Sequence, residues 1–170
     1  MDRKKIKEQA KEAIKGRLWQ YIAPSLLISL LVGLAVFVPS FIFGDESAIT
    51  SIVEIAVQLA AVPASMGLIS YYMKLTRREE VNMNELTRWY GLFGSILVLN
   101  ILISIFVTLW SLLLIIPGII AAISYSMAMY IFVDGNHNAS SCIKESKELM
   151  NGYKSDYFVF ILSFIGWQLL

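Results

Sequence analysis

The chain has 170 residues, and its composition is that of a membrane protein rather than of a soluble domain. Hydrophobic residues make up 57% of the sequence, charged residues 16%, and the mean hydropathy is +0.65. The net charge of +1 conceals a segregated pattern, because the Lys and Arg residues fall in three clusters at 3–17, 74–88 and 144–154. A single cysteine, Cys142, excludes an intrachain disulfide, and with a single histidine, His137, no His/Cys metal site is expected.

The stretches between these clusters are apolar and long enough to cross a bilayer. A Lys or Arg side chain at the centre of a membrane helix costs about 2.5 to 3.5 kcal/mol, and short cytoplasmic loops retain positive charge. The pattern therefore predicts an all-α, polytopic transmembrane helical bundle in the cell membrane with a cytoplasmic N-terminus. Its expected partners are the lipid bilayer, including anionic lipids.

Residues 2–17 are predicted to form a basic amphipathic helix on the membrane surface. Ile6, Ala10, Ala13 and Ile14 share one face at helical spacing. The expected lipid-binding residues are the cations of this segment: Lys4, Lys5, Lys7, Lys11, Lys15 and Arg17. The alternative is a solvated helix without lipid preference. The apolar run that follows is too long for a signal sequence, so it is interpreted as a retained span.

Two spans are expected next, at about 21–43 and 49–73, joined by the acidic turn 44–47. This turn has no Lys or Arg and is placed outside the cell. Pro63 lies in the middle of the second span and predicts a kink, because proline removes one backbone donor. The basic loop from Lys74 to Arg88 then returns to the cytoplasm.

Residues 92–133 contain no charge and are too many for one crossing. Pro117-Gly118 is taken as a tight external turn between a third span, about 92–116, and a fourth, about 119–133. The alternatives are a re-entrant hairpin or one long kinked helix. A single kinked crossing would place the last basic cluster outside, against the positive-inside preference.

The segment 138–153 is again amphipathic and is predicted to be a second cytoplasmic surface helix, begun by Asn138 and ended by Gly152. Its less polar face comprises Ala139, Cys142, Ile143, Ser146, Met150 and Tyr153. Residues 157–170 are apolar but too short to cross a bilayer. The chain is therefore expected to stop inside a fifth span, as a truncated sequence would.

Several motifs together resemble one family. They are Asp2-Arg3-Lys4-Lys5 with Lys15-Gly16, Ile116-Pro117-Gly118-Ile119, Ser124-Tyr125-Ser126-Met127-Ala128, Ser146-Lys147-Glu148-Leu149-Met150-Asn151-Gly152 and Leu162-Ser163-Phe164-Ile165-Gly166-Trp167. In order and over the whole chain, they resemble the bacterial multi-pass membrane proteins catalogued as domain of unknown function 975. The resemblance implies about six membrane helices, a bacterial plasma membrane and a distant similarity to the membrane domain of some glycerophosphodiester phosphodiesterases. It implies no established activity.

Polar residues within the spans are the candidates for a transport route. Glu54 and Gln58 share a face of the second span, and Asn100 and Ser104 share one of the third. The alternative is that such stripes hold helices together, with Glu54 reaching the external interface. A small-residue face of Ala56, Ala60 and Ala64 is expected to contact the bundle or another subunit, identical or different.

No catalytic set is recognised in the sequence. It has no P-loop, dinucleotide-binding fingerprint, nucleophile elbow or paired carboxylates. No catalytic, cofactor-binding or metal residues are therefore assigned, no enzyme activity is expected, and nucleic acid is not an expected partner. The favoured hypothesis is a non-catalytic membrane module that organises lipids or partner proteins. The alternative is a component of a small-solute or ion transporter near Glu54 and Asn100; a lipid-modifying enzyme rests only on the distant similarity.

Overall fold

A computed structural model describes residues 3–168 of the chain, with side chains for residues 5–12 and 14–164. Helices joined by turns make up this range, which contains no strand, so the all-α prediction is confirmed. Residues 2, 169 and 170 of the predicted terminal helices lie outside the described residues, as does the side chain of Lys4. The chain divides into two compact units: a hairpin unit, residues 10–93, and an α5–α9 unit, residues 1–9 and 94–170.

The first helix, α1 (Arg3–Ile14), belongs partly to each unit. It was predicted to continue to residue 17. It ends at Ile14 because Gly16 adopts a positive φ of 78°, a conformation that interrupts a right-handed helix and that glycine adopts at little cost. Lys15 and Arg17 therefore lie in the turn that leads into the next helix.

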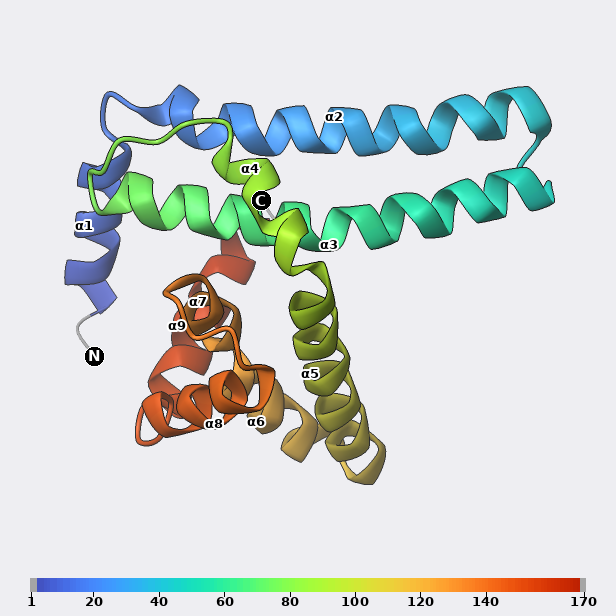
Figure 1. Cartoon of the computed structure of the whole chain (residues 1–170). Coiled ribbons are helices and arrows are strands. Elements are labelled where there is room, and N and C mark those ends of the chain that lie inside the picture. Colours follow the sequence, from blue (N-terminus) through green and yellow to red (C-terminus); the bar gives the residue numbers. More distant parts are fainter. Residues whose placement is uncertain (1–2, 169–170) are drawn as a thin grey trace. The chain divides into compact units, whose positions relative to one another are not determined.

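The hairpin unit is built on α2 (Leu18–Phe43) and α3 (Ala48–Thr76), which run antiparallel and side by side (Figure 1). Between them, the hydroxyl of Ser47 caps α3 by accepting a hydrogen bond from the Ile49 amide at 3.3 Å. Both helices extend beyond the predicted spans at their basic ends, since α2 begins before residue 21 and α3 continues past residue 73. The apolar pattern predicts only the part of each helix that suits lipid. The helix itself continues into the flanking polar residues, because these residues also favour helical structure.

The predicted kink site does not interrupt α3. Pro63 is fully buried, and the helix continues on both sides of it. Pro24 and Pro39 likewise lie within α2. A single proline removes one hydrogen bond of a long helix and leaves the others in place.

The predicted basic loop contains α4 (Glu85–Arg88) and a short 3-10 helix, η1 (Trp89–Leu92), both packed against α3. Close packing here requires a glycine. A Cβ atom added to Gly67 would lie 2.6 Å from the Cα and the carbonyl oxygen of Leu86, which is closer than real Cβ atoms approach. The buried side chains of Tyr71, Leu75 and Leu86 form the core of this junction.

The α5–α9 unit continues from α5 (Phe93–Leu113) to α6 (Ile115–Tyr125), and the break lies at Leu114 rather than at Pro117-Gly118. Leu114 is extended, with φ of −161° and ψ of 143°. Pro117 instead occupies the first turn of α6, where an amide has no partner within the helix and proline costs little. Gly118 is needed for close approach, because an added Cβ would overlap Ser111.

The predicted fourth span, 119–133, is divided between α6 and α7 (Ala128–Val133), with a break at Ser126-Met127. The predicted surface helix is α8 (Ala139–Leu149), which Asn138 caps by accepting a hydrogen bond from the Ser141 amide at 3.0 Å. Gly152 lies beyond it with φ of 82°. The last helix, α9 (Lys154–Gln168), begins before the predicted residue 157.

The less polar face of α8 is covered by protein. Ala139, Cys142, Ile143, Ser146 and Met150 are buried, and α8 packs against α6 and α7. Only Tyr153 of the predicted face, which lies beyond the end of the helix, is exposed. The amphipathic pattern of α8 thus reflects contact with neighbouring helices, and the expectation that this helix lies with its apolar face on a membrane does not fit the structure.

Candidate functional site

Among residues 3–168, four stretches are long and apolar enough to cross a membrane: Leu18–Phe43, Ala48–Thr76, Glu85–Leu113 and Ile115–Val133. The exposure of α2 is the most informative. In its most apolar 18-residue window, no residue is buried within the protein. Phe37 and Phe41 are 62% and 80% exposed. An apolar surface of this extent requires cover from lipid or from other protein.

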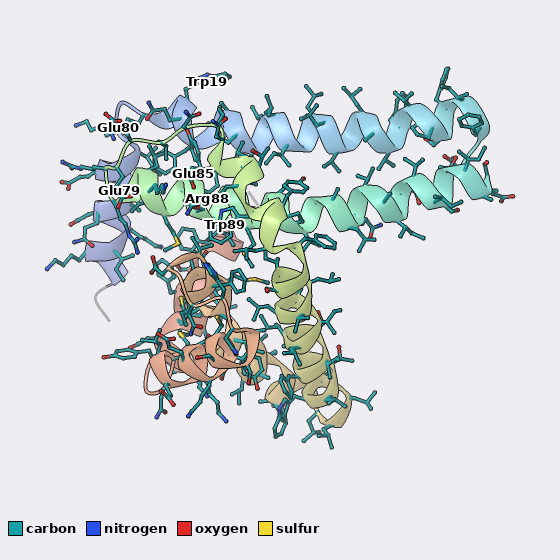
Figure 2. The ribbon with its side chains drawn as sticks, in the orientation of Figure 1. Trp19, Glu79, Glu80, Glu85, Arg88 and Trp89 are labelled. Atoms are coloured by element: carbon teal, nitrogen blue, oxygen red, sulfur yellow. The ribbon has the colours of Figure 1, made fainter. Side chains whose placement is uncertain are left out.

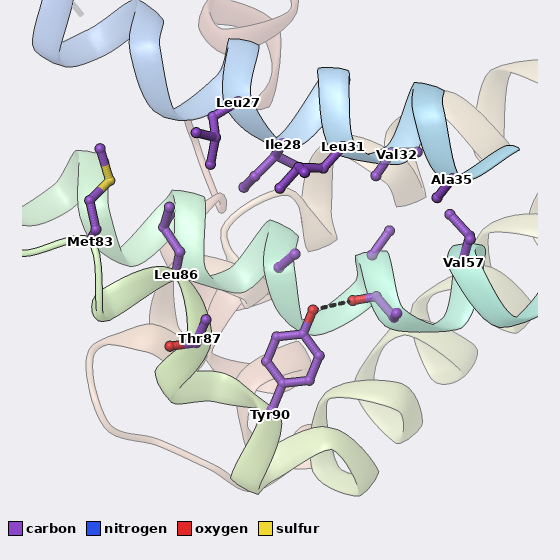
Figure 3. A pocket seen from close by; sticks show the side chains of 13 residues that line it. Leu27, Ile28, Leu31, Val32, Ala35, Val57, Met83, Leu86, Thr87 and Tyr90 are labelled. Carbon is purple, nitrogen blue, oxygen red and sulfur yellow. Dashed lines mark hydrogen bonds between the residues drawn. The ribbon is translucent and has the colours of Figure 1, made fainter. Parts of the chain in front are cut away.

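An apolar groove of about 570 Å³ lies between α2, α3 and residues 83–90 (Figure 3). Aliphatic side chains of α2 form one wall, and small side chains of α3, including Ala60, Ala61 and Ala64, form another. The hydroxyl of Tyr90 donates a hydrogen bond of 2.9 Å to the carbonyl oxygen of Ala60. Two members of the predicted small-residue face, Ala60 and Ala64, therefore line a groove, whereas Ala56 does not line it.

A charged cluster joins α3 to α4 in the same unit. The carboxylate of Glu85 accepts a hydrogen bond from Lys74 Nζ at 2.6 Å and one from Ser70 Oγ at 3.2 Å. Arg88 lies 3.8 Å from the same carboxylate, and Figure 2 labels both residues, which are the first and last of α4. Glu85 is largely buried, so this cluster holds α4 against α3.

This cluster is not predicted when residues 74–88 are interpreted as a loop. A signal was present in the sequence. Ser70 and Lys74 are four residues apart, and Glu85 and Arg88 are three apart, so each pair shares a helical face. What the sequence could not supply was the fold of the chain that brings the two faces together.

The predicted lipid-binding cations have different surroundings. Lys5 and Lys11 are exposed on α1. Lys7 is half-buried, with Nζ 4.8 Å from the ring centroid of Phe164, which is a cation–π contact. Lys15 and Arg17 line a second, smaller cavity in the hairpin unit, together with Arg78 from the end of α3.

The two polar pairs proposed as a transport route belong to different units, with Glu54 and Gln58 on α3 and Asn100 and Ser104 on α5. Glu54 and Asn100 are half-buried, and Gln58 and Ser104 are exposed. The Asn100 side-chain amide donates to the Ile96 carbonyl oxygen of its own helix at 2.9 Å. Asn100 therefore satisfies a donor locally rather than across a channel.

Serine hydroxyls elsewhere in the long helices also bond locally. Ser29 donates to the carbonyl oxygen of Leu26 at 3.0 Å, and Ser65 to that of Val62 at 2.7 Å. These hydroxyls need no partner on another helix.

Neither Cys142 nor His137 stands in a reactive arrangement. Burial, and secondarily the nearby charge of Glu145, raise the pKa of the Cys142 thiol, so little thiolate forms near neutral pH. Its Sγ lies 2.8 Å from the Asn136 carbonyl oxygen, to which it donates. Within residues 3–168, no group of three or more His, Cys, Asp or Glu side chains could hold a metal ion.

Comparison with known proteins identifies the family. The family model described as "Protein of unknown function (DUF975)" matches residues 1–124 and 111–170, which together span the whole chain. No curated protein and no solved structure matches the chain. The resemblance seen in the sequence motifs is thus confirmed, and the chain belongs to the DUF975 family of proteins of unknown function.

Proposed function

We propose that this chain is a multi-pass integral protein of the bacterial cell membrane that acts as a non-catalytic module organising lipids or partner proteins. The observation that carries the proposal is the surface of α2, whose most apolar 18-residue window has no residue buried within the protein. Such an apolar helix surface is unstable in contact with water, and the hydrocarbon core of a bilayer shields it from water. Its orientation follows the positive-inside rule, with all three basic clusters on the cytoplasmic side.

The lipid-organising role is assigned to the N-terminal segment. Of the two amphipathic helices expected from the sequence, α8 has its less polar face packed on α6 and α7, so it needs no membrane. The lysines of α1 include the exposed Lys5 and Lys11. Each basic side chain near an anionic leaflet contributes about 1 kcal/mol of binding. These charges would gather anionic lipids around the protein.

A transport role is not proposed. It would need Glu54, Gln58, Asn100 and Ser104 to line one polar route. Asn100 instead donates a hydrogen bond within α5.

The test is anionic-lipid enrichment around the purified chain. The protein is reconstituted in mixed phosphatidylcholine and phosphatidylglycerol bilayers, extracted mildly, and its retained lipids are quantified by mass spectrometry at low salt. Replacing Lys5 and Lys11 with Gln removes about 2 kcal/mol of attraction and should lower phosphatidylglycerol enrichment roughly thirtyfold. The matched control replaces Lys144 and Lys147 of α8, which removes the same charge from another exposed helix. Equal losses in both variants, or release of the wild-type chain from membranes by alkaline carbonate, would refute the proposal.

A further inference from the structure

A small polar cavity of about 220 Å³ lies in the hairpin unit, where the turn between α1 and α2 meets the end of α3. Its lining comprises Glu12, Lys15, Arg17, Leu75, Thr76 and Arg78. Three cations and one carboxylate thus face a single cavity. Among the residues that the structure describes, the side chains of Lys15, Arg17 and Arg78 make no ion pair or hydrogen bond. The cavity therefore has an uncompensated positive charge.

Two backbone hydrogen bonds fix the position of Arg78 at the end of α3. The amide of Arg78 donates to the Leu75 carbonyl oxygen at 3.2 Å, and the amide of Glu79 donates to that of Lys74 at 3.0 Å. These two bonds form the helix-ending arrangement that usually has glycine at its left-handed position. Because the C-terminal end of a helix disfavours anions, attraction of an anion to this cavity must come from the basic side chains.

Arg78 itself occupies that left-handed position, with φ of 60°, and it is the one residue other than glycine with positive φ among those described. A side chain is strained there, and glycine would relieve the strain. Arg78 nevertheless lines the cavity together with Arg17. Guanidinium groups match the geometry of phosphate oxygens and bind them through paired hydrogen bonds.

The neighbouring residues place the cavity near the level of lipid headgroups. Trp19 follows Arg17 by two residues, is 70% exposed and points outward at the start of α2 (Figure 2). Tryptophan is enriched at the boundary between headgroups and acyl chains. We propose that Lys15, Arg17 and Arg78 form a binding site for a phosphate group, carried by a phospholipid headgroup or by a soluble phosphate. The lipid form of this site rests on the membrane insertion proposed above.

High salt separates this site from diffuse attraction to an anionic surface, because screening at 1 M leaves an interaction range of about 3 Å. The full chain is placed in phosphatidylcholine nanodiscs with and without phosphatidylglycerol, and lipid retention is measured by native mass spectrometry at high salt. Arg17→Gln and Arg78→Gln should each lower phosphatidylglycerol retention about tenfold, the effect of losing a charge-assisted hydrogen bond. Lys144→Gln, which removes the same charge from an exposed position of α8 outside the cavity, should leave it unchanged.

Arg78→Gly distinguishes loss of the site from loss of the fold. Relief of the left-handed strain should raise the Tm of the Arg78→Gly variant, while its phosphatidylglycerol retention falls as in Arg78→Gln. If Arg78 has only a structural role, Arg78→Gly should raise the Tm and leave phosphatidylglycerol retention unchanged. That result, or equal retention in the cavity variants and Lys144→Gln, would overturn the proposal.

Inorganic phosphate identifies the source of the group. The site accepts soluble phosphate if inorganic phosphate raises the Tm of the wild-type chain, but not that of the Arg17→Gln variant, and also displaces phosphatidylglycerol. If the chain retains phosphatidylglycerol and inorganic phosphate has neither effect, the bound group is a lipid headgroup. Binding of neither probe refutes the site. Failure of the membrane proposal would appear differently, as a chain that does not enter nanodiscs at all.

Discussion

At the scale of single residues, the stacked pair Tyr21 and Tyr72 ties α2 to α3 near their basic ends. Their ring centroids are 6.1 Å apart and the rings are nearly parallel. The Tyr72 hydroxyl donates to the Tyr21 carbonyl oxygen at 3.0 Å. The Tyr21 hydroxyl is buried and has no hydrogen-bond partner among the described residues. The hydroxyls of Tyr72 and Tyr21 therefore contribute differently to the stability of the folded chain.

Removing each hydroxyl should change the free energy of unfolding in opposite directions. Tyr72→Phe loses a hydrogen bond and should destabilise the chain by about 0.5 to 1.5 kcal/mol. Tyr21→Phe removes a buried hydroxyl that has no partner and should stabilise it by up to about 1 kcal/mol. Thermal unfolding of both variants in the same detergent provides the comparison, each serving as the other's control. Changes of the same sign would show that the pair is arranged differently.

At the scale of elements, α8 is fixed to the junction of α6 and α7 by one buried serine. Ser146 Oγ donates to the Ser124 carbonyl oxygen at 2.8 Å and accepts from the Met127 amide at 3.1 Å. Ser146 is fully buried. The hydroxyl thus satisfies backbone groups at the point where α6 ends and α7 begins.

Ser146→Ala should cost about 1 to 3 kcal/mol, because buried backbone groups lose their partner. Ser140→Ala, on the exposed face of the same helix, should change stability by about 0.5 kcal/mol or less. Hydrogen exchange at residues 126–128 adds a local readout and should be faster only in the Ser146 variant. Equal Tm values for the two variants would argue against this role for Ser146.

The contact between α3 and α4 depends on the absence of a side chain at Gly67. Gly67→Ala should destabilise the hairpin unit by about 1 to 3 kcal/mol, since the added methyl group would overlap backbone atoms of Leu86 that cannot move aside. Gly33→Ala on α2 is the matched control, because no atom lies within 4 Å of the added methyl group. Its better helix propensity should stabilise α2 by up to about 1 kcal/mol. Equal behaviour of the two variants would contradict the close packing of α4 on α3.

The sequence predicts that the elements are helices and approximately where they lie, but it does not predict the exact helix boundaries or the contacts between helices. The apolar stretches identify α2, α3 and α5 because their side chains suit lipid, and the Asn138 cap was recognisable locally. The break at Leu114 was missed because Pro117 suits both a turn and a first helical turn. The residues of the less polar face of α8 were predicted, but that face was expected on the membrane surface and packs instead against α6 and α7. Of the candidate site, the sequence identified Lys15 and Arg17, while Arg78 joins them only through the fold.

At the scale of the whole molecule, the account depends on the separation of charge from apolar sequence. Basic residues 3–17, 74–88 and 144–154 alternate with two apolar stretches, which hold most of the length of the candidate spans found among the described residues. If the spans cross a bilayer, the turn at residues 44–47 and the segment at 77–84 lie on opposite sides of it. The cost of a buried cation is the physical reason for this arrangement.

Cysteine labelling in intact cells tests this claim most directly. Glu46→Cys and Glu79→Cys introduce exposed thiols and leave the Lys and Arg count unchanged, so they should not alter the orientation. The native Cys142 is buried and its pKa is raised, so the background should be silent, and Cys142→Ala checks it. An impermeant maleimide should label Glu46→Cys in intact cells and Glu79→Cys only after permeabilisation. Labelling of Glu79→Cys from outside would contradict the account.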